Sequence, residues 1–360
     1  MGCIYSSEGL VIVILMRAIA RIVFLLLLSS FMSCHQGGAT SDAKTSSIDT
    51  GSAKAGATMV SAMYAGRNAP ISFTTSAPIV LSGEHDRVIN GSATQHITLI
   101  RCSNITIKNC KIGPYRKAGI SLLNCTNIKI DSCYLYYVST GIYAGYSTTI
   151  SITNCQAKNM VGPFPEGQFV QFNVVKGGGN RVSFNKLENV LGQSNTEDAI
   201  SMHKSDGLPA DPIVIESNWI KGGGPSRSGG GIMLGDGGGS YMVAKNNILV
   251  DPGQYGMAVS GGSHMSIVNN TIYAKAQPFT NNGIYYRNLA KLPTSDITIA
   301  KNEVNYTSSK HVLNNTYLGP GELTPTGWNT NVYNTRLNEN ILPAKIVSEL
   351  ISKNPFDDLK

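Results

Sequence analysis

Short segments in which hydrophobic and polar residues alternate recur along the chain, and each ends in Cys or Asn. Alternation with a period of two residues predicts β-strands with one buried face. A constant strand separated by variable insertions is typical of a solenoid. RVSFNKL (181–187) fits as a degenerate copy in the longest gap. The clear copies are ITIKNC (105–110), IKIDSC (128–133), ISITNC (150–155), IVIESN (213–218), MVAKNN (242–247), MSIVNN (265–270) and ITIAKN (297–302).

A second repeated segment precedes each of these strands and begins with a small residue. It reads GISL (119–122), GIYA (141–144), AISM (199–202), GIML (231–234), GMAV (256–259) and GIYY (283–286). Each coil therefore has at least two strands, which predicts a single-domain, all-β, right-handed parallel β-helix. The closing Asn residues would form a buried amide ladder, each side chain bonding the turn of the next coil.

The ends of the chain differ from this repeat. Residues 1–34 contain the apolar run IVFLLLL and end at Cys34, which predicts a lipoprotein-type signal peptide with lipidation of Cys34. An ordinary signal peptide with an incidental cysteine is the alternative. Residues 35–57 form a Ser/Gly/Ala/Thr-rich tether, and residues 58–360 the β-helix catalytic domain with a C-terminal cap, in which 341–353 would form a short helix. The protein would be exported, either as a cell-surface, outer-membrane or periplasmic lipoprotein or in secreted form.

The cysteines of the repeat align in two columns, which raises the question of disulfides. Parallel stacked side chains rarely have the torsion that a disulfide needs, so free buried thiols are favoured. Zinc is disfavoured because a linear ladder cannot surround a tetrahedral ion. One column holds Cys110, Cys133 and Cys155, and the other Cys102 and Cys125.

Composition and charge limit the classes of partner that the protein is expected to bind. The chain has 38 Gly and only 14% charged residues, which suits a turn-rich all-β solenoid, and its formal net charge is +7. A mild positive excess suits an anionic substrate, although general solubility explains it equally well. Because no basic run is present, a nucleic-acid partner is not predicted, and the protein is expected to be a monomer.

The register of the strands predicts which residues face outward. The small residues at the strand starts (119, 141, 199, 231, 256 and 283) would form a glycine-rich strip, and thus a shallow groove for a polymer. The alternative is that these glycines only follow tight turns. Ser201 would align with Tyr285, and His203 with Gly235 and Arg287.

Ionisable residues gather in the central coils, where they favour β-elimination of a polyuronate. That reaction needs a cation beside the carboxylate, a base for the C5 proton and an acid for the leaving oxygen. Hydrolysis would need two carboxylates that flank the bond. Glu197 and Asp198 are adjacent and point in different directions, although Asp236 could supply a partner.

Several central segments resemble bacterial β-helix polysaccharide lyases, and most closely the alginate lyases of polysaccharide lyase family thirty-one. They are EDAISMHKS (197–205), the stretch from 211 to 240, DPGQYGMAVSGG (251–262) and QPFTNNGIYYRN (277–288). The resemblance implies endolytic β-elimination of alginate, with Lys204 the leading catalytic candidate and Arg227, Tyr255 and His203 beside the uronate. The predicted catalytic set is Lys204, Tyr255 and His203; the predicted substrate-binding set is Arg227, Arg287, Tyr285, Glu197, Asp198 and Asp236.

Other functions remain open at this point. A glycoside hydrolase or uronan C5-epimerase could use the same scaffold, and a non-catalytic surface protein could bind glycan with it. No cofactor is predicted, although Ca²⁺ could bind if Glu197, Asp198 and Asp236 came together. The expected partners are an anionic polysaccharide and, through the lipid anchor, a membrane.

Overall fold

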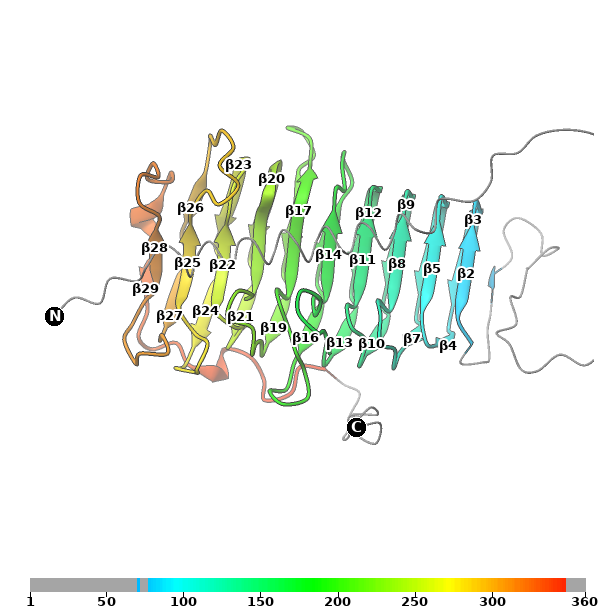
Figure 1. The fold of residues 1–360 in the computed structure, drawn as a ribbon, viewed down its shortest axis with the longest axis horizontal. Helices are drawn as coiled ribbons and strands as arrows, with labels where there is room; N and C mark the ends of the chain where they lie inside the picture. Colours follow the sequence, from blue (N-terminus) through cyan, green and yellow to red (C-terminus); the bar gives the residue numbers. More distant parts are fainter. Residues whose placement is uncertain (1–69, 72–76, 348–360) are drawn as a thin grey trace, which may run out of the picture. The chain divides into compact units, whose positions relative to one another are not determined.

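The computed structural model describes residues 70–71 and 77–347. The predicted signal peptide, its Cys34 and the whole tether lie outside these residues, as does the end of the predicted C-terminal helix. In the described part the chain winds through successive coils, each of which contributes short parallel strands (Figure 1).

The strands stack in three columns. The first column contains β2 (Ile79–Ser82), β5 (Ile97–Ile100), β8 (Ile120–Leu123), β11 (Ile142–Gly145), β14 (Val170–Asn173), β17 (Ile200–Asp206), the first part of β20 (Ile232–Lys245), β22 (Tyr255–Val259), β25 (Asn282–Tyr286) and β28 (Thr316–Leu318). The second contains β1 (Pro70–Ile71), β3 (His85–Asn90), β6 (Ser103–Lys108), β9 (Thr126–Asp131), β12 (Thr148–Thr153), β15 (Arg181–Ser183), β18 (Ile213–Glu216), the second part of β20, β23 (Ser263–Val268) and β26 (Thr298–Ala300). The third contains β4 (Ala93–Thr94), β7 (Lys111–Ile112), β10 (Tyr134–Tyr136), β13 (Gln156–Lys158), β16 (Lys186–Glu188), β19 (Trp219–Lys221), β21 (Ile248–Val250), β24 (Thr271–Ala274), β27 (Glu303–Tyr306) and β29 (Val332–Tyr333).

These columns confirm the predicted parallel β-helix. Because β20 runs through two columns, the first and second form one 19-stranded sheet, and the third is a separate ten-stranded sheet. Both repeated segments of the sequence occupy equivalent positions in successive coils. The only helices among the described residues are two short 3₁₀ turns, η1 (Trp328–Thr330) and η2 (Glu339–Ile341).

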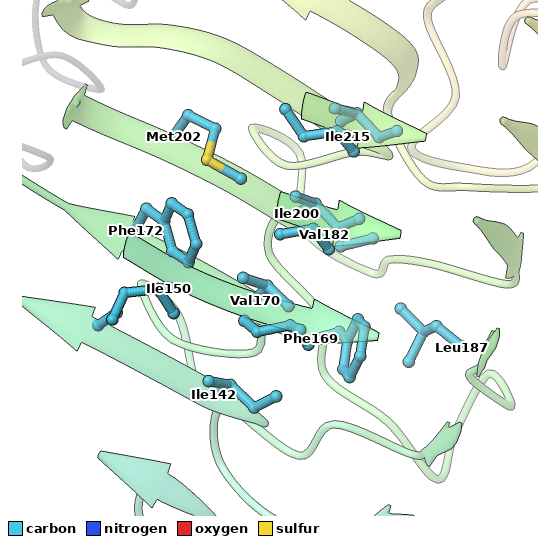
Figure 2. Close-up of a cluster of buried hydrophobic side chains, with 14 of the residues drawn as sticks. Ile142, Ile150, Phe169, Val170, Phe172, Val182, Leu187, Ile200, Met202 and Ile215 are labelled. Carbon is cyan, nitrogen blue, oxygen red and sulfur yellow. The ribbon is translucent and has the colours of Figure 1, made fainter. Parts of the chain in front are cut away.

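The core lies inside the coils and consists of the inward residues of all three columns. Ile120, for example, stacks on Ile142, which stacks on Val170, and all three are fully buried. Figure 2 shows this packing in the central coils, where Phe169 and Phe172 fill the space beside aliphatic neighbours. Continuous stacking of inward side chains removes apolar area from water at every coil, which is the main stabilising contribution.

The corner after the second-column strands from β6 to β26 is closed by Cys or Asn, as predicted, whereas Ser92 closes the corner after β3. Each Asn side chain bonds both the backbone and the side chain of its neighbour. The Asn247 Oδ1 accepts the Asn218 N–H at 3.0 Å and the Asn218 Nδ2–H at 2.9 Å, while the Asn247 Nδ2 donates to Asn270 Oδ1 at 3.0 Å. The amide ladder is therefore confirmed. It runs through Asn185, Asn218, Asn247, Asn270, Asn302 and Asn331.

The five repeat cysteines are free, buried thiols, as the sequence predicted. The Cys133 thiol, for instance, lies 3.4 Å from the Asp131 carbonyl oxygen of its own corner. Cys155 is the last corner cysteine before the corners change to Asn. Its N–H donates to the Asn185 Oδ1 at 2.9 Å.

Two predictions about the first column were wrong. The strand β14 was not predicted, because Phe169 stands where the other coils carry a small residue, although the degenerate copy RVSFNKL had indicated the second-column strand of the same coil. The glycine strip is not an outward groove. A Cβ on Gly231 would lie 2.1 Å from the Gly256 carbonyl oxygen and 2.4 Å from a Leu249 methyl carbon, so this position faces the next coil and the core. These positions hold glycine because the chain turns there and neighbouring atoms leave no room for a side chain.

The tail was expected to end in a helix that caps the solenoid, but residues 342–347 contain no helix. They lie against the outer face of the third column, where Leu342, Ile346 and Val347 form a buried cluster with Val250. The Lys221 ammonium donates to the carbonyl oxygens of residues 343 and 344 at 2.8 Å each. The tail therefore lies along the side of the central coils.

Candidate functional site

The outer face of the first column carries several of the residues that the sequence singled out. One outward row follows the strand register and includes Ser201 and Tyr285, which confirms the predicted alignment of these two. Its members are Tyr143, Gln171, Ser201, Met233, Ala258, Tyr285 and Tyr317.

A second outward position pairs an imidazole with a carboxylate. His203 aligns with Asp236, not with Gly235 as predicted, because the register between β17 and β20 shifts at an irregularity after Ser201. Gly235 absorbs this shift with a left-handed φ of +64°. The His203 Nδ1 lies 3.4 Å from the Asp236 Oδ2, and the two side chains are 14% and 11% exposed. A carboxylate at this distance can orient the imidazole through its Nδ1.

Lys204 lies beside this pair and is exposed. Its φ of +46° breaks the usual alternation of the strand. A Cβ placed on Gly237 would lie 2.8 Å from His203 Cε1 and 3.2 Å from Lys204 Cε, so both side chains pass directly over this glycine. His203, Lys204 and Asp236 therefore form one cluster with an accessible ammonium group.

A second polar cluster lies at the start of β17 and is buried. The Glu197 carboxylate accepts hydrogen bonds from the hydroxyls of Ser226 and Ser228, the latter at 2.9 Å. The Asp198 Oδ1 accepts the Gly230 N–H at 3.1 Å and the Tyr255 hydroxyl. Tyr255 is fully buried, so its hydroxyl does not reach the surface of this face. The structure thus separates Tyr255 from His203 and Lys204.

The two predicted arginines lie at different places. Arg227 is exposed on the loop between β19 and β20. Arg287 follows β25 and is half-buried, with its Cβ and Cγ packed against Gly319. Tyr285 adjoins the buried cluster, since its ring meets the Tyr255 ring edge-on at 5.1 Å between centroids.

The three carboxylates considered for Ca²⁺ do not come together. Glu197 and Asp198 bind the serines and Tyr255, whereas Asp236 faces His203. Across residues 77–347 no group of three His, Cys, Asp or Glu side chains is arranged to hold a metal ion.

Sequence reasoning missed several residues of the site. Asn173 aligns with His203 and donates to the Tyr143 hydroxyl at 2.8 Å. Burial raises the pKa of Tyr143, although the Asn173 amide opposes this effect. Asn173 belongs to the strand β14 that was not predicted, and the alternating segment FVQFN was the signal that could have found it. Ser226 and Ser228 lie in a glycine-rich loop whose sequence gives no indication of their partner.

Comparison with known families gives the class of the protein. The sequence model described as a right handed beta helix region matches residues 66–190 and 174–317. The chain belongs to this right-handed β-helix family, in agreement with the stacked parallel strands. No curated protein matches the chain.

Solved structures that are similar include tailspike proteins of E. coli bacteriophage HK620. A mutant in complex with a hexasaccharide has 13% identity and a TM-score of 0.46, over 68% of this chain and 46% of that chain. A double mutant in complex with a pentasaccharide has 12% identity and a TM-score of 0.38, over 72% and 58%. The chain thus spans about half the length of these tailspike chains. The described residues contain no helix that is long and apolar enough to cross a membrane.

Proposed function

We propose that the chain is a polysaccharide lyase that cleaves a uronic-acid polymer by β-elimination on the outer face of the first column. The observation that carries this proposal is the His203–Asp236 pair beside the exposed Lys204 ammonium. An oriented base next to a cation suits removal of a proton α to a carboxylate. Alginate is the proposed substrate because of the resemblance of the central segments to alginate lyases.

The reaction assigns a separate task to each member of the cluster. Lys204 neutralises the uronate carboxylate, which lowers the cost of forming negative charge at C5. With Nδ1 facing Asp236, the tautomer protonated at Nδ1 has its lone pair on Nε2, and this nitrogen takes the C5 proton. The electron pair forms the C4–C5 double bond, the C4–O bond breaks, and the leaving oxygen takes a proton from water.

The buried cluster has a supporting role in this scheme. Because Tyr255 is fully buried and donates to Asp198, it holds the loop at Gly230 and the ring of Tyr285 instead of protonating the leaving group. Glu197 and Asp198 are each 4% exposed and accept internal hydrogen bonds, so they do not flank a polymer as two hydrolytic carboxylates would. This arrangement favours elimination over hydrolysis.

The test is formation of the unsaturated product from alginate, pectate and glucuronan, followed by ultraviolet absorbance of the new double bond. We expect His203→Ala to lower kcat by about 10²- to 10⁴-fold with an unchanged melting temperature. His264→Ala is a matched control, because His264 also places Nδ1 at 3.3 Å from an Asp296 carboxylate but is 41% exposed. It should keep full activity.

The outcome against the proposal is equally clear. If His203→Ala and His264→Ala cleave every polymer at the same rate, His203 is not the base. Reducing ends without a double bond would indicate a hydrolase, and an altered uronate configuration without cleavage would indicate a C5-epimerase.

A further inference from the structure

The Tyr285 side chain extends along the axis of the solenoid and does not point straight out into solvent. Its hydroxyl is 4.0 Å from the Met233 Sδ, although Ala258 separates these two residues in the register. Neighbouring strands are about 4.8 Å apart, so the side chains of Tyr285 and Met233 together bridge two coil spacings along the sheet. Ala258 is fully buried. The ring therefore passes over Ala258, and only a very small side chain there leaves room for it.

The ring is also fixed from one side. Tyr255 meets it at an interplanar angle of 83° and a centroid distance of 5.1 Å. Tyr255 is itself held by the Asp198 carboxylate and is fully buried. An aromatic ring that lies across a sheet and is held by a perpendicular neighbour presents one face to solvent, and Tyr285 is partly exposed.

The next coil continues this surface. Tyr317 aligns with Tyr285 in the register of β25 and β28, and it is 38% exposed. Arg287 follows two residues after Tyr285, and its side chain therefore points to the same face of the sheet. Aromatic faces next to a guanidinium group match the apolar face and the carboxylate of an acidic pyranose.

We infer that Tyr285 and Tyr317 form an aromatic platform that binds successive sugar rings of an acidic polysaccharide on the C-terminal side of the His203–Asp236 pair. Arg287 binds a carboxylate of the same polymer, and Ala258 determines whether the platform can form. This inference rests on the proposed function for the class of polymer. It adds the direction in which the polymer extends from the reacting sugar.

The experiment measures binding of the full chain to long alginate by affinity electrophoresis, and cleavage rates on long and short alginate chains. Tyr285→Ala should weaken binding about tenfold, and Ala258→Leu should weaken it equally by lifting the ring, although it removes no binding group. Tyr285→Phe should lose less than Tyr285→Ala. Tyr317→Ala should weaken binding about threefold and lower kcat/KM on long chains only. The control is Phe184→Ala, because Phe184 is 57% exposed on a different corner.

The outcomes separate this inference from the proposed function. Cleavage by the wild type together with unchanged binding by Tyr285→Ala or Ala258→Leu overturns the platform and leaves the lyase in place. Binding that depends on Tyr285 and Ala258 without any cleavage supports the platform and refutes the lyase. If the wild type does not bind the polymer, or Phe184→Ala weakens binding as much as Tyr285→Ala, the platform is wrong.

Discussion

The N-terminal coils, residues 79–155, and the central coils, residues 181–302, use the same three strands but close the corner after the second strand differently. In the N-terminal coils from β6 onward the corner holds a thiol, whose contacts to carbonyl oxygens are long; the Cys133 Sγ lies 3.7 Å from the Ile107 oxygen. In the central coils the corner holds an amide, and Asn247 alone takes part in hydrogen bonds to Asn218, Ile215 and Asn270. A thiol fills space, whereas an amide ties three coils together.

The difference teaches where directional bonds are needed. The central coils have long insertions between the third and first columns, and these loops carry Glu197, Asp198 and Arg227. They are also the coils on which the tail lies, through the Glu188 carboxylate and Lys221. We interpret the amide ladder as the element that keeps the strand register fixed where loops of different length leave the core. Register matters there because it sets His203 opposite Asp236.

The largest expected effect on stability comes from replacing a corner Asn by Ala, and it is compared with the same replacement of a corner Cys. Asn247→Ala should reduce the free energy of unfolding by about 4 kcal/mol, since the buried N–H and amide of Asn218 lose their acceptor and the Ile215 oxygen loses its donor. Cys133→Ala should cost only about 1 kcal/mol, because it removes one buried atom with weak hydrogen bonds. Equal losses in guanidinium unfolding of the two variants would refute the distinction between the corners.

A slightly smaller effect is expected at the tail. Lys158 and Glu188 form a buried ion pair, with side chains 7% and 9% exposed, and the Glu188 Oε2 also accepts the Ile346 N–H at 2.9 Å. Lys158→Met leaves the carboxylate buried without its cation and should cost about 3 kcal/mol at pH 7. The control is Lys245→Met, whose pair with Glu216 is more exposed and should contribute about 0.5 kcal/mol or less.

The pH dependence of this loss gives a second readout. Burial raises the pKa of Glu188, but the Lys158 ammonium and the tail amides outweigh it, so that the pKa lies below its ordinary value. A lowered folded-state pKa means that the contribution is present above the unfolded-state pKa, about 4.3, and is lost as pH falls through the folded value. The gap in unfolding midpoint between the wild type and Lys158→Met should therefore narrow at low pH. A gap independent of pH would contradict the assignment.

The same contrast explains what the sequence could predict. The strands and the amide ladder follow from local alternation and from a corner Cys or Asn that recurs in most coils, as at Asn218. The His203–Asp236 alignment depends on where the extra residue is absorbed, and several glycines around Gly235 allow more than one register. Alternation gave the wrong face for the glycine strip, because the chain turns at Gly231. The contact of Glu188 with Ile346 joins residues 158 positions apart and has no local signal.

A smaller stability effect than those at Asn247 and Lys158, and the sharpest test of the site, comes from two glycines with nearly equal φ angles. Gly237, beside His203, has a φ of +70°, and Gly83, in the N-terminal coils, has a φ of +68°. Alanine at either position should cost about 1 kcal/mol for the left-handed backbone. Apart from Gly83 and its two chain neighbours, no residue has an atom within 4 Å of a Cβ placed on Gly83, whereas a Cβ on Gly237 would lie 2.8 Å from His203 Cε1.

Gly237→Ala should therefore displace the imidazole from its alignment with Asp236 and lower kcat by about tenfold, since a small misplacement of a catalytic group is costly. Gly83→Ala should have the same melting temperature as Gly237→Ala and full activity. The two variants thus separate the energetic effect of the backbone angle from the positioning of His203. If both variants retain full activity on a polymer that the wild type cleaves, the position of His203 does not depend on the absence of a side chain at residue 237. The proposed geometry of the base is then wrong.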